Sequence, residues 1–338
     1  MIIKENFSLK NFNTFKIDVN ARFYAELESA EQIFELTSQK EFQNLPVLFL
    51  GEGSNILFTK NYDGIVVRLI SKGIKVVDEN SEFIFVNAQA GELWDDLVTF
   101  CVDKEYYGIE NLSLIPGTVG AAPIQNIGAY GVELKDVFDS LEGFNLDDQQ
   151  KIILNNNQCA FGYRNSIFKN ALKNKFLIAN VTLKLKKEKS FNLNYRAFQE
   201  FIQKKKSTEI TIKEVSDLVK RIRMSKLPDP SKLGNAGSFF KNPEVDKKKF
   251  AELKKSFSDL VFFKVDEHSY KIPAGWLIEK CGFKGKKSGK VGTHNKQSLV
   301  IVNLGSADGI EIVNFAEQIV QAVHTKFGIK LTPEVNII

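Results

Sequence analysis

Long apolar runs and cysteines are both scarce in this sequence of 338 residues. No apolar run approaches the length of about 20 residues that a membrane helix needs, and the N-terminal MIIKENFSLKNF has no apolar stretch of signal-peptide length. The 3 cysteines, Cys101, Cys159 and Cys281, lie far apart and form no C-x-x-C pair. This pattern fits free thiols in a reducing compartment better than a disulfide framework. The sequence therefore predicts a cytoplasmic protein.

Histidine is also rare, and charge of one sign does not dominate. No His/Cys/Asp cluster that includes His268, His294 or His324 has the spacing of metal ligands. The formal net charge of +5 is too small and too dispersed for a nucleic-acid binder, although a mild positive excess suits anionic, phosphate-carrying substrates. We expect no metal, no nucleic-acid partner and no membrane partner.

The hydrophobic and charged fractions, 43% and 26%, are those of an ordinary globular protein with room for two or three domains. Alternation and apolar runs predict strands at 47–50, 65–69, 72–77, 83–88, 176–187 and 298–303. Capping patterns and glycines predict helices at 29–42, 92–105, 211–227, 246–257, 274–281 and 309–327, with Gly108, Gly282 and Gly328 at C-terminal ends. The predicted class is α+β, with a larger strand-rich N-terminal part and a smaller mixed C-terminal part.

The segment LGEGSNILF at 50–58 is the first of two glycine-rich stretches. Gly51 and Gly53 would let backbone amides approach a phosphate, and the side chains of Ser54 and Asn55 add donors. The stretch is not a Rossmann fingerprint, because Ile56 stands at the third glycine position and no helical pattern follows. By itself it fits an ordinary tight turn about as well as a phosphate site.

The segment IPGTVGAAPIQNIGAYG at 115–131 is the second, with small residues, few charges and two prolines. Such a composition is expected in neither a helix nor a regular strand. It favours a buried, irregular loop that wraps a flat apolar group and presents amides to an anion, because long loops in compact domains are usually functional. The alternative is a tightly packed crossover loop. Together the two stretches predict a dinucleotide cofactor bound without a Rossmann turn.

Three longer motifs extend this reading: FGYRNSIFK at 161–169, LPDPSKLGNAGSFFKNP at 227–243 and PAGWLIEKCGFKG at 273–285. With the glycine-rich stretches they resemble the FAD-binding flavoproteins of the vanillyl-alcohol-oxidase (PCMH) type, and most closely the enolpyruvoylglucosamine reductases. The likeness runs from Asn13-Thr14-Phe15 to Glu334, and Tyr195 resembles the substrate-loop tyrosine of the longer subclass. It implies a two-part FAD-binding domain, 1–70 and 71–225, and a smaller α+β substrate-binding domain, 226–338. The last strand is a candidate to return to the flavin site.

The resemblance also implies an activity. NADPH would reduce a non-covalently held FAD, which would then reduce UDP-N-acetylglucosamine enolpyruvate to UDP-N-acetylmuramate for peptidoglycan precursors. A histidyl–flavin bond is not expected, because every histidine lies outside the expected flavin domain, whereas a cysteinyl bond through Cys101 or Cys159 stays open. The alternatives are a flavin oxidase of the same superfamily and a non-catalytic UDP-sugar or flavin-binding protein.

Three residues are candidates for catalysis. Arg164 offers a planar fork for a carboxylate or phosphate, although alone it would be interpreted as an ion pair. Ser238 follows Gly-Asn-Ala-Gly and lies in no G-x-S-x-G elbow, so acyl transfer is disfavoured. The resemblance places Arg164 against the substrate carboxylate, makes Ser238 the proton donor, and sets Glu334 beside the enolpyruvyl carboxylate.

The resemblance supplies the remaining site residues. Those expected to bind the cofactor are Gly51, Glu52, Gly53, Ser54, Asn55, Ile115, Pro116, Gly117, Gly120, Ala121, Ala122, Gln125, Asn126, Gly128, Ala129, Tyr130 and Gly131. Those expected to hold the UDP-sugar, each with a plain surface alternative, are Tyr195, Lys226, Asn242, Lys284 and Gln297.

Overall fold

The computed structural model describes residues 1–204 and 209–338, which form two compact units. Unit 1 consists of Met1–Phe7, Ala21–Glu52 and Tyr62–Ser225, and unit 2 of Ser8–Asn20, Gly53–Asn61 and Lys226–Ile338. The first part of the chain therefore alternates between the units. The predicted α+β class is confirmed, whereas the predicted boundaries at 70/71 and 225/226 stay predictions.

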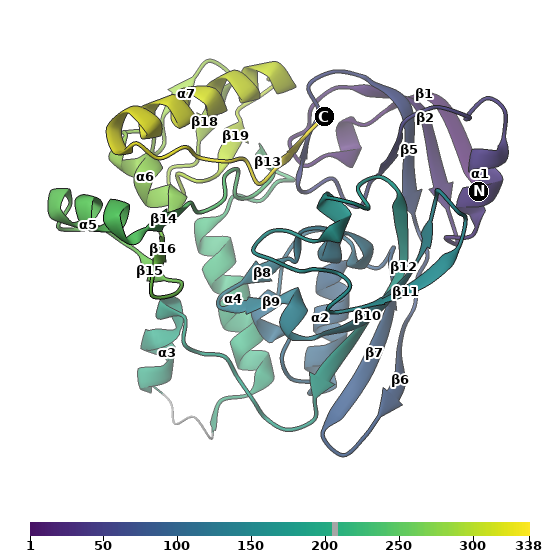
Figure 1. Cartoon of the computed structure of the whole chain (residues 1–338), viewed down its shortest axis with the longest axis horizontal. Helices are drawn as coiled ribbons and strands as arrows, with labels where there is room; N and C mark the ends of the chain where they lie inside the picture. Colours follow the sequence, from purple (N-terminus) through teal and green to yellow (C-terminus); the bar gives the residue numbers. More distant parts are fainter. Residues whose placement is uncertain (205–208) are drawn as a thin grey trace. The chain divides into compact units, whose positions relative to one another are not determined.

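The two larger sheets of unit 1 are visible in Figure 1. The first has the order β1-β2-β5-β3 and consists of β1 (Ile2–Ser8), β2 (Asn20–Leu27), β5 (Tyr62–Leu69) and β3 (Val47–Phe49). The second has the order β11-β10-β12-β7-β6 and is antiparallel throughout. Its strands are β6 (Ile74–Glu79), β7 (Phe83–Gln89), β10 (Phe138–Asn145), β11 (Lys151–Asn155) and β12 (Phe176–Lys186).

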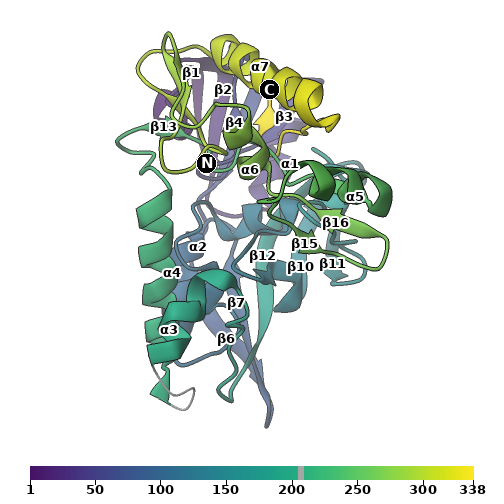
Figure 2. The ribbon, with the colours of Figure 1, turned by 90° about the vertical axis from the view of Figure 1, so that its left-hand side faces the viewer.

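Helices complete the core of unit 1. Helix α2 (Trp94–Asp103) buries Trp94, Leu97, Val98 and Cys101 at helical spacing against the inward residues of β7 and β12. Helix α4 (Ile212–Lys226) lies beside α2 (Figures 1 and 2), with its Lys220 Nζ 3.6 Å from Asp95 Oδ2. The predicted capping box that begins α4 is confirmed, because Thr211 and Glu214 exchange hydrogen bonds. The short helices are α1 (Gln32–Ser38) and α3 (Gln199–Lys204).

Two local predictions were wrong, and one helix was predicted slightly too long. The helix predicted at 29–42 spans only Gln32–Ser38. The one predicted at 92–105 spans Trp94–Asp103, with Glu105 in the left-handed region at φ +57°. The stretch 115–131 is more regular than predicted, because it contains a 3₁₀ helix, Val119–Gln125, and a hairpin of β8 (Gly128–Ala129) and β9 (Val132–Glu133). Tight turns on either side of Pro123 make a 3₁₀ helix possible despite the proline.

Unit 2 has a four-stranded sheet of order β13-β19-β18-β17. Its strands are β13 (Gly234–Asn235), β19 (Ile301–Asn303), β18 (Val291–Thr293) and β17 (Lys287–Ser288). Helix α7 (Gly309–Phe327) packs on β18 and β19, and α6 (Ala274–Lys280) packs against α7 (Figure 1). Helix α5 (Lys247–Ser256) accompanies a smaller sheet of β14 (Glu244–Asp246), β16 (Ser269–Lys271) and β15 (Phe263–Lys264). The predicted helix-ending glycines are confirmed, with φ +77° at Gly282 and +63° at Gly328.

The last strand of unit 2 pairs with a strand from early in the sequence. β20 (Asn336–Ile337) runs parallel to β4 (Ile56–Leu57). The Ile338 carbonyl oxygen accepts hydrogen bonds from Thr59 N and Oγ1 at 2.8 and 2.7 Å, and Asn336 N donates to Asn55 O at 3.1 Å. The end of the chain therefore lies directly beside the turn Gly53–Asn55.

One carboxylate is buried in unit 1, at the start of the loop that leads into 115–131. Glu110 is 1% exposed, and its Oε2 accepts a hydrogen bond from Gly108 N at 2.7 Å. Burial raises the pKa of Glu110, and hydrogen bonds from the backbone of residues 108–110 oppose that shift. The native state therefore holds a proton at pH values where the unfolded chain has lost it.

We expect Glu110→Gln to change the pH dependence of stability. Because the pKa is raised on folding, wild-type stability falls as pH rises from about 4.5 through the folded-state pKa. The variant lacks this titration, so the difference in melting temperature, wild type minus variant, should shrink across that window. Thermal unfolding from about pH 4.5 to 7.5 measures it. The exposed Glu82→Gln should stay parallel to wild type, and a constant difference for Glu110→Gln would contradict the assignment.

Candidate active site

The two glycine-rich stretches meet inside unit 1. An ideal Cβ on Gly51 would lie 2.7 Å from Thr118 Oγ1 and 3.4 Å from Ala121 Cβ, so no side chain fits there. The next residue, Glu52, is paired with Arg68, whose Nη2 lies 2.9 Å from Glu52 Oε1. Two stretches that are far apart in sequence and were expected to share one cofactor are therefore in contact.

Gly120 is required by packing within the chain. Its ideal Cβ would lie 2.6 Å from Ala90 Cβ, and its N–H donates to Ala90 O at 3.0 Å. The neighbouring Val119 N–H donates to Glu92 O at 2.8 Å, and Gly117 O accepts from Trp94 N at 2.9 Å. These amides hold the stretch 115–131 against the connection between β7 and α2.

The donors and charges around these stretches fit an anionic, planar cofactor. Residues 115–131 contain no acidic side chain, and the one carboxylate of the first turn, Glu52, is paired with Arg68. Backbone amides, the hydroxyl of Ser54 and the amides of Asn55 and Gln125 are the groups that suit a diphosphate and a flavin ring. This chemistry agrees with the FAD expected from the sequence.

The side chain of Arg164 contacts the second glycine-rich stretch, residues 115–131. Its Nη2 donates to Gly128 O at 2.7 Å and its Nη1 to Asn126 O at 3.5 Å. Both Arg164 and Asn126 have left-handed backbones, with φ +52° and +47°. The Asn126 side chain donates to Glu133 Oε2 and Gly162 O at 2.9 and 3.1 Å. This strained, hydrogen-bonded arrangement holds the guanidinium in one orientation.

An aromatic cluster and a second arginine lie near this segment in unit 1. The rings of Tyr130 and Tyr195 meet edge to face at 5.3 Å, and both pack on Phe198. Burial lowers the pKa of Arg223, as does the nearby Arg164, whereas Tyr130 and Asp95 raise it. Arg223 was not predicted as a site residue, because its basic, polar segment RIRMSK is typical of a solvated helix face.

In unit 2, the structure brings Ser238 and Glu334 together. Glu334 N donates to Phe239 O at 2.8 Å, and Lys241 N donates to Thr332 O at 2.9 Å, so residues 332–334 pair with 239–241. Asn55 Nδ2 donates to Glu334 O at 3.4 Å. Two candidate catalytic residues and one candidate cofactor residue therefore share one small group of backbone contacts.

Two of the expected substrate residues lie at the first turn of α6. Asn242 Oδ1 accepts from Ala274 N at 2.9 Å and so caps the helix. Gln297 Oε1 lies 3.0 Å from the ideal Cβ position of Gly275. The capping role of Asn242 was not predicted, and it leaves the amide nitrogen as the atom with which this residue can donate to a ligand.

The other expected substrate residues are more dispersed. Lys284 Nζ lies 2.8 Å from Glu279 Oε1 in an ion pair on the surface. Lys226 is exposed at the end of α4, and its backbone is hydrogen bonded to the side chain of His294. Tyr195 belongs to unit 1, where it is 37% exposed. Lys226 thus adds exposed positive charge to unit 2, whereas the charge of Lys284 is paired with that of Glu279.

Neither candidate thiol for a cysteinyl–flavin bond is suited to that reaction. Cys101 and Cys159 are both 0% exposed within the hydrophobic core of unit 1. Burial raises the pKa of the Cys159 thiol to about 12 and that of Cys101 further still, so the reactive thiolate is disfavoured at both. Within residues 1–204 and 209–338, no group of three His, Cys, Asp or Glu side chains could hold a metal ion, and no helix could cross a membrane.

Comparison with known proteins identifies the family. An FAD-binding domain model matches residues 21–149, and the model of the UDP-N-acetylenolpyruvoylglucosamine reductase C-terminal domain matches residues 229–338. The UDP-N-acetylenolpyruvoylglucosamine reductase of Flavobacterium johnsoniae is 46% identical and that of Pseudomonas aeruginosa 43%. The matches cover 100% and 99% of this chain and 100% and 98% of the relatives. The chain belongs to the UDP-N-acetylenolpyruvoylglucosamine reductase family.

Membership in the reductase family confirms the activity and the cofactors expected from the sequence. The chain is a flavoenzyme of peptidoglycan precursor synthesis, a UDP-N-acetylmuramate dehydrogenase that uses FAD and NADPH. The crystal structure of the reductase from Thermus caldophilus shares the fold, with a TM-score of 0.68 and 23% identity over 100% of this chain and 99% of that one. The oxidase and the non-catalytic binding protein do not agree with this membership.

We expect Gly120→Ala to destabilise unit 1 and to lower its FAD content. The new methyl group would overlap Ala90 Cβ, and overpacking of this kind costs about 1–3 kcal/mol. Ala90→Gly in the same chain removes the overlapping atom and should recover most of both losses. Thermal unfolding and the flavin absorbance of purified protein measure the two effects. If the double variant is no better than Gly120→Ala, contact with Ala90 is not what requires the glycine.

Proposed function

We propose that Arg164, Ser238 and Glu334 carry the catalysis of this reductase. The observation that supports the proposal most strongly is the pairing of residues 332–334 with 239–241, beside Asn55. It holds a carboxylate and a hydroxyl next to a turn of the expected cofactor site. The hydrogen bonds of Arg164 to Gly128 and Asn126 support its assignment to the same reaction, because they join it to the second cofactor segment.

Each residue has a distinct part in this proposal. Bound FAD supplies the hydride chemistry that links NADPH to the vinyl carbon of the substrate. Arg164 binds the enolpyruvyl carboxylate and stabilises the negative charge that develops there, as an oriented cation does in a site that excludes water. Glu334 is assigned to the same carboxylate. Ser238 donates the proton that the substrate carbon needs after hydride transfer.

The substrate in this proposal is UDP-N-acetylglucosamine enolpyruvate. Lys226 and Lys284 suit its diphosphate as point charges, and the amides of Asn242 and Gln297 suit its polar sugar or uracil groups. Tyr195 is proposed to contact the same ligand. FAD is held without a covalent bond by residues 51–55 and 115–131, in keeping with the buried, protonated thiols. We place the reaction in the cytoplasm. Its partners in this proposal are NADPH and UDP-N-acetylglucosamine enolpyruvate, which are both small anions, and it involves no nucleic acid.

Arg164 and Glu334 should matter only after the flavin is reduced. Arg164→Ala should slow flavin reoxidation by the enolpyruvyl substrate by about 10²–10³, the range for loss of one charge-stabilising donor. Flavin reduction by NADPH should stay close to wild type, because the nicotinamide needs no carboxylate clamp. Glu334→Ala should show the same split. Stopped-flow flavin absorbance separates the two half-reactions, and an equal loss in both would indicate displaced flavin instead.

Ser238→Ala should lose about 10²–10⁴ in turnover, the usual worth of a positioned proton transfer. It should keep bound FAD and its reduction by NADPH, because the hydroxyl is needed only once the substrate carbon has become strongly basic. Ser238→Cys retains a donor and should recover part of the rate. Single-turnover reoxidation, followed by product analysis, gives the measurement. Near-normal reoxidation with normal product in the Ala variant would remove Ser238 from the mechanism.

A further inference from the structure

Residues Asn13–Phe15, which we call the bridging segment, lie between the two turns of unit 2 that carry candidate site residues. The first turn is Gly53–Asn55, assigned to the cofactor. The second precedes Ser238. The catalysis proposed above gives the bridging segment no role. Its backbone nevertheless contacts both turns.

The contact with the first turn leaves no room for a side chain. An ideal Cβ on Gly53 would overlap Phe12 O and lie 2.8 Å from Asn13 Cα, and Gly53 has φ +62°. Thr14 N and Thr14 Oγ1 both donate to Gly53 O, at 3.1 and 3.3 Å. The turn therefore cannot shift without moving Thr14.

The bridging segment contacts the second turn through the backbone carbonyl of Thr14 and the ring of Phe15. Asn235 N donates to Thr14 O at 3.0 Å, and Asn235 Oδ1 accepts from Gly237 N at 2.9 Å. The ring of Phe15 meets that of Phe239 edge to face, with centroids 6.3 Å apart and both rings fully buried. Ser238 thus lies between two residues, Gly237 and Phe239, that are linked to the bridging segment.

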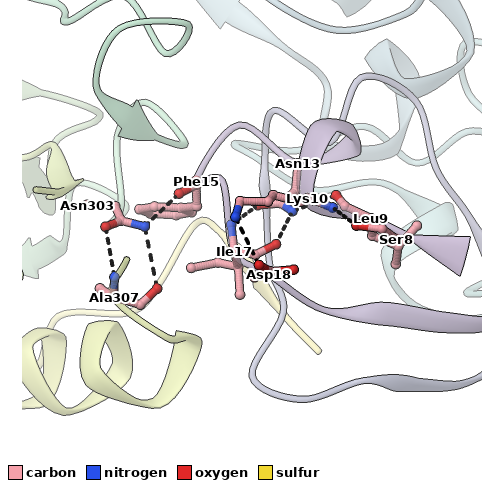
Figure 3. A network of polar contacts seen from close by, with 9 residues as sticks. All are labelled: Ser8, Leu9, Lys10, Asn13, Phe15, Ile17, Asp18, Asn303 and Ala307. Atoms are coloured by element: carbon pink, nitrogen blue, oxygen red, sulfur yellow. Dashed lines mark hydrogen bonds and ion pairs between the residues drawn. The ribbon is translucent and has the colours of Figure 1, made fainter. Parts of the chain in front are cut away.

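Two buried asparagines hold the bridging segment itself (Figure 3). Asn13 Nδ2 donates to Leu9 O and Ile17 O at 2.8 and 3.0 Å, and its Oδ1 accepts from Ile17 N at 2.9 Å. Asn303 Nδ2 donates to Phe15 O at 2.9 Å, and its Oδ1 accepts from Ala307 N at 3.1 Å. Both side chains are almost fully buried, so these bonds are made in a low dielectric and define one conformation.

From this arrangement we propose that Phe15 is a positioning residue for Ser238. The proposal rests on the function proposed for Ser238 and for the turn Gly53–Asn55. Thr14 fixes the segment to the cofactor turn, and Phe15, packed on Phe239, sets the place of the Ser238 hydroxyl relative to that turn. A displacement of about 1 Å in a reacting group can cost about 10²-fold in rate, so the loss of one ring contact is enough to matter.

A double-mutant cycle tests the proposal in the FAD-loaded enzyme. Phe15→Leu should leave FAD content and flavin reduction by NADPH unchanged, and slow reoxidation by UDP-N-acetylglucosamine enolpyruvate by about 10- to 100-fold. In a Ser238→Ala background the same substitution should add little, because residues that act as one unit are not additive. The matched control is Phe315→Leu, a buried ring in the same unit with one comparable edge contact, to Phe283 at 6.0 Å. It should slow neither half-reaction.

Two results would overturn the proposal. One is a Phe15→Leu effect of the same size in both backgrounds, which would mean that Phe15 does not act through Ser238. The other is no effect on reoxidation at all. If Ser238→Ala alone leaves reoxidation normal, the role proposed for Ser238 fails, and this inference fails with it. Should Phe15→Leu bind less FAD than wild type, the cycle is run with Phe15→Met, which keeps the side-chain volume.

Discussion

An approach too close for a Cβ atom, made at three glycines, is the constraint on which both parts of the candidate site depend. In unit 1, Gly51 lies against Thr118, and Gly120 lies against Ala90. In unit 2, Gly53 lies against the backbone of residues 12–13. A side chain at any of these points would push segments apart, and at Gly120 and Gly53 it would disturb the hydrogen bonds with Ala90 and Thr14. The glycines therefore set the spacing of segments that come from distant parts of the sequence.

Because the segments are spaced in this way, the candidate site residues are held largely by contacts with the backbone. Arg164 donates hydrogen bonds to two neutral carbonyl groups, those of Gly128 and Asn126, which orient the guanidinium. Backbone pairing places Glu334 beside Phe239, the residue that follows Ser238. The order of this part of the candidate site is therefore maintained by backbone amides and carbonyls.

Elements with local signals could be predicted from the sequence. The capping box of α4, the alternation of β12 and the glycine after α7 each act over a few residues, and all three were correct. The helix predicted at 92–105 ends two residues early, at Asp103, because Glu105 adopts the left-handed conformation against its intrinsic preference. The 3₁₀ helix around Pro123 was missed for a similar reason, since its composition alone favours an irregular loop.

The candidate residues themselves came from long motifs rather than from local chemistry. No short-range pattern marks Arg223 as half-buried near Arg164 and Tyr130, or Asn242 as the cap of a helix that begins 32 residues later. The same holds for the contacts of Thr14 with Gly53 and Asn235, which join separate parts of the sequence. Such contacts depend on the tertiary fold, and a single sequence carries no record of which distant residues meet.

The pairing of β20 with β4 has a consequence for synthesis of the chain. The hydrogen bonds that join these strands span 279 to 281 residues, so residues 53–61 leave the ribosome long before their partner exists. Contacts between residues so far apart in sequence form late in folding, because the long loop between them must close first. Unit 1 can collapse around its own core during translation, while the early segments of unit 2 stay exposed until the last strand arrives. The nascent protein thus passes through a stage with an uncovered strand edge, a state in which chaperones would find a substrate.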